Sequence, residues 1–313
     1  MSRWRNRTHG GTTRDEEAYE TDLATLIETK AHAARTAPPT VVPALAERLT
    51  VTEHRVPGPP GGPGVRVRVF RPREATGRLP GVLWIHGGGF VLGSIDAVWA
   101  PAAATALGVG AVVVTAGYRL APDHVFPAAL DDCYATLCWL ADEAPGLGVD
   151  VGRIGVLGVS SGGALAAGVA LLARDLGGPA VCFQHLSTPV LDDRADTPSM
   201  LEFEDTPVWN AALARQSWRY YLGDAPGPVS AYAAPARAED LSGLPPAYIA
   251  TAEFDPLRDE GILYGLRLLQ AGVPVELHSY PEAFHGFGQA ISADVGRRSG
   301  QESLDALRRG LAG

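Results

Sequence analysis

The stretch Arg153-Ile154-Gly155-Val156-Leu157-Gly158-Val159-Ser160-Ser161-Gly162-Gly163 decides the fold of this chain. Residues 154–157 are apolar and β-prone, and a helix of small residues follows the glycines. A serine between two glycines at a strand-to-helix junction sits on a tight, strained turn that lifts its hydroxyl above the sheet. The alternative is a serine merely tolerated in a small-residue turn. A catalytic interpretation therefore requires a base, an acid and an oxyanion site elsewhere in the chain.

The pattern around this motif predicts an α/β fold. A β-hairpin is expected at 50–56 and 65–70, and further strands at 81–85, 111–115, 154–157, 180–186, 247–252 and 275–280. Helices are expected at 128–143, 161–175, 257–271 and 292–311. Continuous apolar strands that alternate with helices are typical of a mostly parallel sheet covered on both faces.

Two segments interrupt this alternation and predict a helical cap. Residues 15–35 have helical spacing and 41–49 suit a short helix, so 1–49 is expected to form an N-terminal cap segment. Residues 192–221 lack strand character and are expected to contribute to the same cap. The catalytic domain is then predicted to span 50–313.

Composition narrows the classes of function. The chain has 313 residues, 46% of them apolar and 19% charged, with a net charge of −9, and it has no basic stripe for nucleic acid. The longest apolar stretch, 156–173, is broken by serines and glycines, so no membrane span is expected, and residues 1–14 lack the apolar core of a signal peptide. Three cysteines, Cys133, Cys138 and Cys182, fit neither a disulfide framework nor a zinc site, which favours a reducing, cytoplasmic location.

His285 is the preferred base. It lies in a loop after the strand that ends near Tyr280, and ligands of parallel sheets bind outside the carboxyl ends of the strands. The alternative role for His285 is to fill a turn before glycine, and His278, within the preceding strand, is the weaker rival.

Asp255 is the preferred acid, because it also follows a strand and a histidine base needs a carboxylate to hold its tautomer. The alternative for Asp255 is a helix N-cap, with Pro256 at the first helical position. Three neighbouring acids are rivals that we expect to be solvated or ion-paired: Glu253, Asp259 and Glu260.

The run His86-Gly87-Gly88-Gly89-Phe90 follows another predicted strand. Glycines let the backbone approach a substrate closely, and a developing oxyanion requires N–H donors. The alternative is a flexible glycine loop, and His86 is interpreted as a structural residue that shapes it. The N–H of Ser161 is the expected second donor. The chain has no zinc-protease motif, no paired cysteine ligands and no phosphate-binding loop, so neither a metal nor a nucleotide cofactor is expected.

Taken together, these motifs resemble the bacterial hormone-sensitive-lipase-like esterases of the α/β-hydrolase superfamily. The resemblance covers roughly residues 50–310 and rests on five motifs in the family's order: His86-Gly87-Gly88-Gly89-Phe90, Tyr118-Arg119-Leu120-Ala121-Pro122, Gly158-Val159-Ser160-Ser161-Gly162-Gly163, Asp255-Pro256-Leu257-Arg258-Asp259-Glu260 and His285-Gly286-Phe287. It implies an α/β-hydrolase fold with an eight-stranded, mostly parallel sheet and a helical cap. It also implies a nucleophile Ser160, an acid Asp255, a base His285, and an oxyanion hole of Gly87, Gly88, Gly89 and Ser161.

The activity that the resemblance implies is a serine carboxylesterase, which cleaves small esters of short acyl chains through an acyl-enzyme intermediate. An amidase or deacetylase with the same triad is the alternative, and a non-catalytic binding protein on the same scaffold is a second one. Val159 and Ser161 depart from the family pattern, which often has an acid and an alanine there, so substrate preference is left open. The predicted strand 275–280 offers an edge for a homodimer, with a monomer as the alternative. Four tryptophans are candidate pocket walls, although core positions are commoner for this residue: Trp4, Trp99, Trp209 and Trp218.

Overall fold

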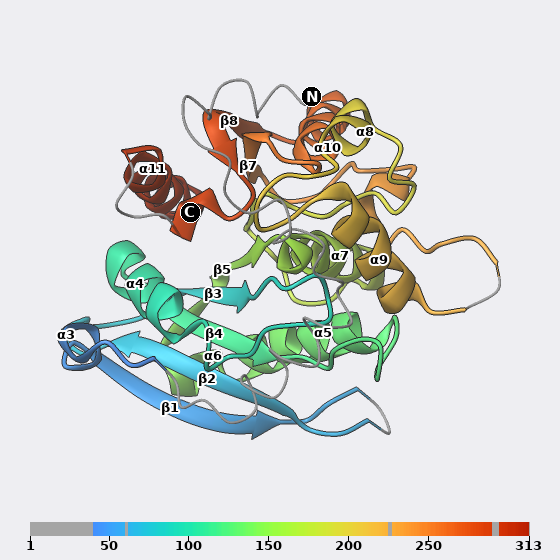
Figure 1. Cartoon of the computed structure of the whole chain (residues 1–313). Coiled ribbons are helices and arrows are strands. Elements are labelled where there is room, and N and C mark those ends of the chain that lie inside the picture. Colours follow the sequence, from blue (N-terminus) through green and yellow to red (C-terminus); the bar gives the residue numbers. More distant parts are fainter. Residues whose placement is uncertain (1–39, 60–61, 225–226, 290–293, 313) are drawn as a thin grey trace.

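The fold is built around one twisted eight-stranded sheet (Figure 1). The computed structural model describes residues 40–59, 62–224, 227–289 and 294–312. The strands lie in the order β1-β2-β4-β3-β5-β6-β7-β8. Their bounds are β1 Leu49–Val56, β2 Val65–Pro72, β3 Leu79–Ile85, β4 Val112–Gly117, β5 Val149–Val159, β6 Phe183–Ser187, β7 Ala247–Phe254 and β8 Val275–Phe284.

The sheet is mostly parallel, as the sequence predicts. β1 pairs antiparallel with β2 as a hairpin, and β2 pairs antiparallel with β4. All pairs from β4 through β8 are parallel. Because parallel strands end at the same edge of a sheet, the loops after β3, β5, β7 and β8 are gathered at one end.

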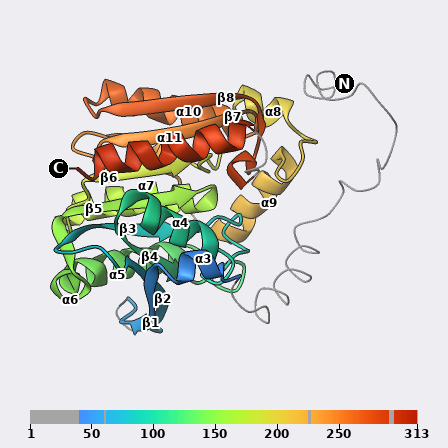
Figure 2. The same cartoon turned by 90° about the vertical axis from the view of Figure 1, so that its left-hand side faces the viewer.

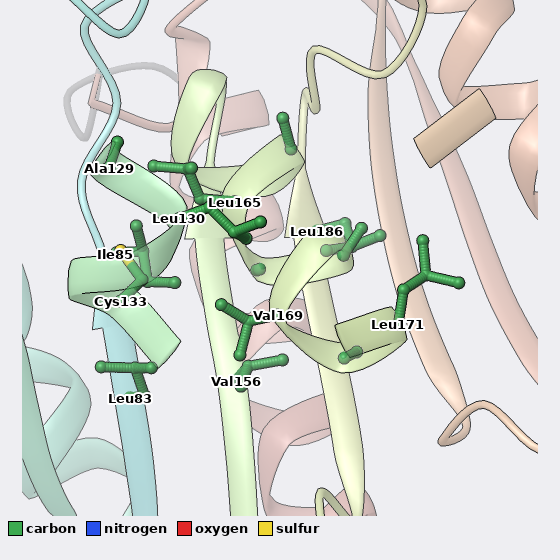
Figure 3. Packing of buried hydrophobic residues seen from close by; sticks show 14 of the residues in the cluster. Leu83, Ile85, Ala129, Leu130, Cys133, Val156, Leu165, Val169, Leu171 and Leu186 are labelled. Atoms are coloured by element: carbon green, nitrogen blue, oxygen red, sulfur yellow. The ribbon is translucent and has the colours of Figure 1, made fainter. Parts of the chain in front are cut away.

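Helices cover both faces of the sheet. One face carries α5 (Ala128–Asp142), α7 (Ser161–Leu176) and α10 (Arg258–Gln270), and the other carries α4 (Trp99–Val109) and α11 (Asp294–Gly310). Figure 3 shows the first layer from close by, where Val169 of α7 lies beside Val156 of β5 and Leu165 lies beside Leu130 of α5. These side chains are fully buried, so α7 is held rigidly against the strand that precedes it.

The remaining described elements are five short ones and one longer helix. They are α3 Pro43–Ala46, α6 Ala144–Leu147, α8 Pro198–Glu202, the 3₁₀ turns Pro235–Arg237 and Phe287–Gln289, and the longer α9 Ala211–Leu222. Segment 192–221 contains α8 and most of α9 and no strand, in agreement with the sequence pattern. Figure 2 shows α8 and α9 beyond one end of the sheet. The helix expected at 15–35 lies outside the described residues, so the division into a cap at 1–49 and a domain at 50–313 stays a prediction.

Helix α4 was not predicted. Trp99–Val109 is rich in alanine, and its apolar residues do not follow one helical stripe, so periodicity gives little signal. The helix ends at Gly110, which has a left-handed φ of 75° and returns its N–H to the carbonyl of Ala106. Trp99 packs edge-on against Phe70 with ring centroids 5.7 Å apart, which makes it a core residue rather than a pocket wall.

Candidate active site

Ser160 lies at the junction between β5 and α7, because the strand ends at Val159 and the helix begins at Ser161. Its φ of 57° and ψ of −122° are strained for a residue with a side chain. The two flanking glycines allow the turn, since a Cβ at Gly158 would collide with the carbonyl of Gly162, and a Cβ at Gly162 with the carbonyl of Ile85. Steric clashes therefore explain why the motif has glycine on both sides of Ser160.

The backbone of Ser160 is held on both sides. Its N–H donates to the carbonyl of Ser187 over 2.9 Å. Its own carbonyl accepts the N–H of Gly163 at 2.8 Å and that of Val190 at 3.1 Å. The loop that follows β6 thus holds the backbone of the strained serine, from which its hydroxyl projects.

His285 approaches Ser160 from the loop after β8. His285 Nε2 lies 3.0 Å from Ser160 Oγ, across 125 positions in the sequence. The imidazole is 6% exposed and the serine 7%, so little water reaches the pair. This distance is within hydrogen-bond reach for a base and the hydroxyl proton that it would take.

Asp255 lies on the other side of the same imidazole. Asp255 Oδ2 is 2.8 Å from His285 Nδ1, and the carboxyl is fully buried. The carboxylate therefore fixes the tautomer with Nδ1 protonated, which leaves Nε2 free to accept a proton. The interpretation of Asp255 as a helix N-cap with Pro256 at the first helical position is wrong, because α10 begins only at Arg258. Asp255 Oδ1 still accepts the N–H of Leu257 at 3.0 Å, a local turn that stiffens the carboxyl.

The rival residues lie elsewhere or have other partners. His278 forms ion-pair contacts with Glu276 and Glu302 at 3.0 and 3.1 Å, away from Ser160. Asp259 is ion-paired with Arg258, and Glu253 accepts the N–H of Glu282.

Glu260 contradicts the expectation of a solvated or ion-paired acid. It is 2% exposed, and no cation among the described residues pairs with it. Sequence reasoning could not anticipate this, because Glu260 occupies the first turn of a helix, where an acid is ordinarily favoured for its charge.

The glycine loop after β3 runs beside the nucleophile. A Cβ at Gly87 would lie 3.1 Å from the Cβ of Ser160 and 2.7 Å from the carbonyl oxygen of Val159. Gly89 has a φ of 59°, and a Cβ there would lie 2.5 Å from Trp209. The loop thus has no room for side chains at Gly87 and Gly89, and its backbone passes close to Ser160. Gly88 lies between them, and Ser161 is fully buried at the start of α7.

His86 supports this loop rather than the proton transfer. Its Nδ1–H donates to the carbonyl of Gly87 at 2.9 Å and lies 3.1 Å from the hydroxyl of Tyr118. Tyr118 in turn donates to the His86 carbonyl at 2.8 Å, and the two rings stack with centroids 4.2 Å apart. Burial lowers the pKa of His86 to about 4, so the ring is neutral at neutral pH.

Trp209 is the side chain of segment 192–221 that packs on both His285 and Gly89. Its ring centroid is 5.9 Å from that of His285, and its Cη2 packs on Gly89. The hydroxyl of Thr206 donates to the Trp209 carbonyl at 2.8 Å, which fixes Trp209 two residues before α9. Trp218 lies deeper, with its ring 5.4 Å from that of Phe90. The sequence offered both as candidate walls but could not rank them, because neither position follows a motif.

Within the described ranges, no group of three His, Cys, Asp or Glu side chains is arranged as a metal-binding set. None of the helices described is long and apolar enough to cross a membrane.

Comparisons with known proteins agree with this geometry. Residues 82–289 match the family described as alpha/beta hydrolase fold. The chain is 41% identical over 271 residues to Esterase LipI of Mycobacterium tuberculosis, covering 85% of this chain and 83% of that protein. It is 40% identical over 282 residues to Carboxylesterase NlhH of the same species, covering 88% and 86%.

Among solved structures, the Bacterial Heroin Esterase superposes with a TM-score of 0.87 at 46% identity, covering 93% of this chain and 92% of that one. An esterase of Pyrobaculum calidifontis gives 0.81 at 38%, covering 93% and 94%. The chain therefore belongs to the α/β-hydrolase fold family, in its hormone-sensitive-lipase-like esterase branch.

Proposed function

We propose that this protein is a serine carboxylesterase that hydrolyses small esters of short acyl chains. The observation that carries the proposal is the buried chain of contacts from Ser160 through His285 to Asp255. Relatives that span more than four fifths of this chain are named esterases and carboxylesterases, which supports the same reaction class here.

In the first step, Ser160 Oγ attacks the ester carbonyl carbon while its proton moves to His285 Nε2. The carbonyl π electrons move to oxygen, and the tetrahedral intermediate carries one negative charge there. Asp255 stabilises the imidazolium without taking its proton. The intermediate collapses as the imidazolium protonates the leaving alkoxide, so the alcohol departs and an acyl-serine ester remains.

In the second step, water takes the place of the alcohol. His285 accepts a proton from the water as its oxygen attacks the acyl carbon, and a second oxyanion forms. Its collapse breaks the bond to Ser160 Oγ, which recovers its proton from His285. The products are one alcohol and one carboxylic acid, and the protein returns to its starting state.

The oxyanion is stabilised by backbone N–H groups of Gly88, Gly89 and Ser161, with Gly87 shaping the same loop. The support is the closeness of Gly87 to Ser160 and the rigidity that the steric limits at Gly89 impose on the loop. Rigid donors suit this role because they need no reorganisation as charge develops.

Short acyl groups are proposed because Trp209 fills the space beside Gly89 and His285. An amidase or deacetylase with the same triad is the second candidate, and one relative of 31% identity is named Arylacetamide deacetylase. The two are separated by kcat/KM for a matched aryl ester and anilide of acetate through hexanoate. Preference for the acetate or butyrate ester supports the proposal, and faster cleavage of the anilide contradicts it.

The cap, the oligomeric state and the location belong to the same proposal. The cap that controls entry is formed by 192–221 together with residues of 1–49 other than α3 and Leu49, because α3 packs on α4 and β1, and Leu49 begins β1.

A homodimer would pair along β8, the edge strand, beside the exposed Leu263, Leu266, Leu269 and Leu277. Molar mass in solution, compared with that of Leu266→Glu, tests the dimer. The cytoplasm is proposed because all three cysteines are free.

A further inference from the structure

The carboxyl of Glu260 is a buried acid that the proposed reaction does not use. It lies in the first turn of α10 with 2% of its surface exposed. Oε1 accepts the backbone N–H of Leu191 at 2.6 Å and that of Asp192 at 3.4 Å. Oε2 is buried without a hydrogen-bond partner among the described residues. Burying a carboxyl in this way is costly, so the position calls for an explanation.

The two N–H groups belong to the loop that holds the nucleophile. That loop follows β6, and its Val190 N–H donates to the Ser160 carbonyl at 3.1 Å. The next residue, Leu191, donates its own N–H to Glu260. A displacement of residues 190–192 would therefore reach the strained backbone of Ser160 directly.

Glu260 itself belongs to the helix that follows the turn carrying Asp255, the proposed acid of the triad. The N–H of Arg258 donates to the Asp255 carbonyl at 3.0 Å, and the helix that contains Glu260 begins there. Asp255 holds His285 from this turn. Glu260 thus links the backbone behind the nucleophile to the backbone behind the acid.

We propose that Glu260 is a positioning residue, which keeps Ser160 in register with the Asp255–His285 pair by holding the N–H groups of Leu191 and Asp192. This inference rests on the proposed function, because it assumes that Ser160 is the nucleophile. Glu260 does not contact the reacting atoms, so it acts on the rate through geometry alone.

The charge state of the Glu260 carboxyl decides which substitution best preserves its contact with the two N–H groups. Burial raises the pKa of the Glu260 carboxyl well above its usual range, the charges of Asp192 and Asp255 raise it further, and the N–H of Leu191 offsets part of the shift. Burial therefore favours the neutral form of this carboxyl over the charged one. Glutamine has the same shape and the same accepting oxygen as a neutral glutamic acid, so Glu260→Gln preserves the contact with the N–H groups of Leu191 and Asp192. Glu260→Ala removes this contact. Glu260→Asp shortens the side chain by one methylene, so its carboxyl no longer reaches these N–H groups.

The test measures kcat and KM on a short-chain aryl ester for Glu260→Ala, Glu260→Asp and Glu260→Gln, with kcat expressed per site labelled by a serine-directed phosphonate. We expect kcat to fall by up to about 100-fold in the alanine variant, since a misplacement of about 1 Å costs this much. KM should stay within about twofold, because no substrate contact is lost. Glu260→Gln should recover most of kcat and Glu260→Asp should not. Glu239→Ala, at an exposed glutamate, is the matched control and should behave as wild type.

Two results would overturn the proposal. One is wild-type kcat per labelled site in Glu260→Ala, whatever its thermal stability, because that describes a residue needed only for folding. The other is Glu260→Gln as slow as the alanine or aspartate variant, because the acid and not the accepting oxygen would then matter. If the alanine variant does not fold, the glutamine and aspartate variants decide alone. Labelling of the wild-type protein is measured before any variant. Failure to label Ser160 in that protein would count against the proposed function and not against the role of Glu260.

Discussion

His285 Nε2 lies 3.0 Å from Ser160 Oγ, and Asp255 Oδ2 lies 2.8 Å from the opposite nitrogen of the same ring. Three loops, after β5, β7 and β8, bring these side chains to one buried place. The arrangement depends on a sheet whose parallel strands end together.

The first prediction separates the two roles of Asp255. Asp255→Asn should lower kcat on the order of 10⁴-fold, because an amide favours the wrong histidine tautomer. Its stability should change little, since the amide oxygen can still accept the N–H of Leu257. Steady-state kinetics and thermal unfolding of the same sample measure both. Asp240→Asn, at an exposed aspartate, is the control. A kcat within tenfold of wild type would mean that Asp255 only stiffens its turn.

The second prediction concerns the size of the acyl group. Trp209→Ala removes the ring that packs on Gly89 beside His285. A hexanoate ester should then gain about tenfold in kcat/KM relative to acetate, because burying two of its four additional methylenes contributes about 1.6 kcal/mol. Trp209→Phe should lie between the two proteins. An unchanged ratio of hexanoate to acetate would place the acyl group away from Trp209.

The third prediction concerns acid stability. His185 on β6 is buried, its Nε2 lies 2.7 Å from Ser303 Oγ, and burial lowers its pKa to about 3. His185 takes up a proton near pH 6.5 in the unfolded chain but stays neutral there in the folded chain. The contribution of neutral His185 to the free energy of unfolding is therefore fully present above pH 6.5 and is lost as the pH falls towards 3. From pH 7 to pH 5 this group alone should cost about 2 kcal/mol of the free energy of unfolding.

Urea unfolding at both pH values checks this. His185→Gln should lose about 2 kcal/mol less than wild type over that range, while His124→Gln, at an exposed histidine, should keep the wild-type dependence. Equal pH dependence in His185→Gln and wild type would show that His185 is protonated in the folded state.

The sequence predicted those parts of the molecule that depend on local pattern. Apolar runs predicted the strands, and residues placed just after strands were expected to meet, which is where Ser160, Asp255 and His285 lie. The turn at Gly158 and Gly162 could be anticipated for a similar reason, since its steric requirement appears in the motif itself.

The missing parts depend on contacts between distant segments. Helix α4 has no amphipathic stripe, so it was missed. The partners of Glu260 are backbone N–H groups in a loop without a signature, so its burial could not be inferred. Trp209 follows no motif either, and its place beside Gly89 depends on how segment 192–221 folds over the strand ends.

The most direct measurement is the site of covalent labelling by a serine-directed phosphonate, located by mass spectrometry and paired with turnover of a short-chain aryl ester. We predict one label per chain, on Ser160, and a loss of kcat on the order of 10⁶-fold in Ser160→Ala, which should also take up no label. A label on Ser161 or another residue, or turnover retained by Ser160→Ala, would contradict the account.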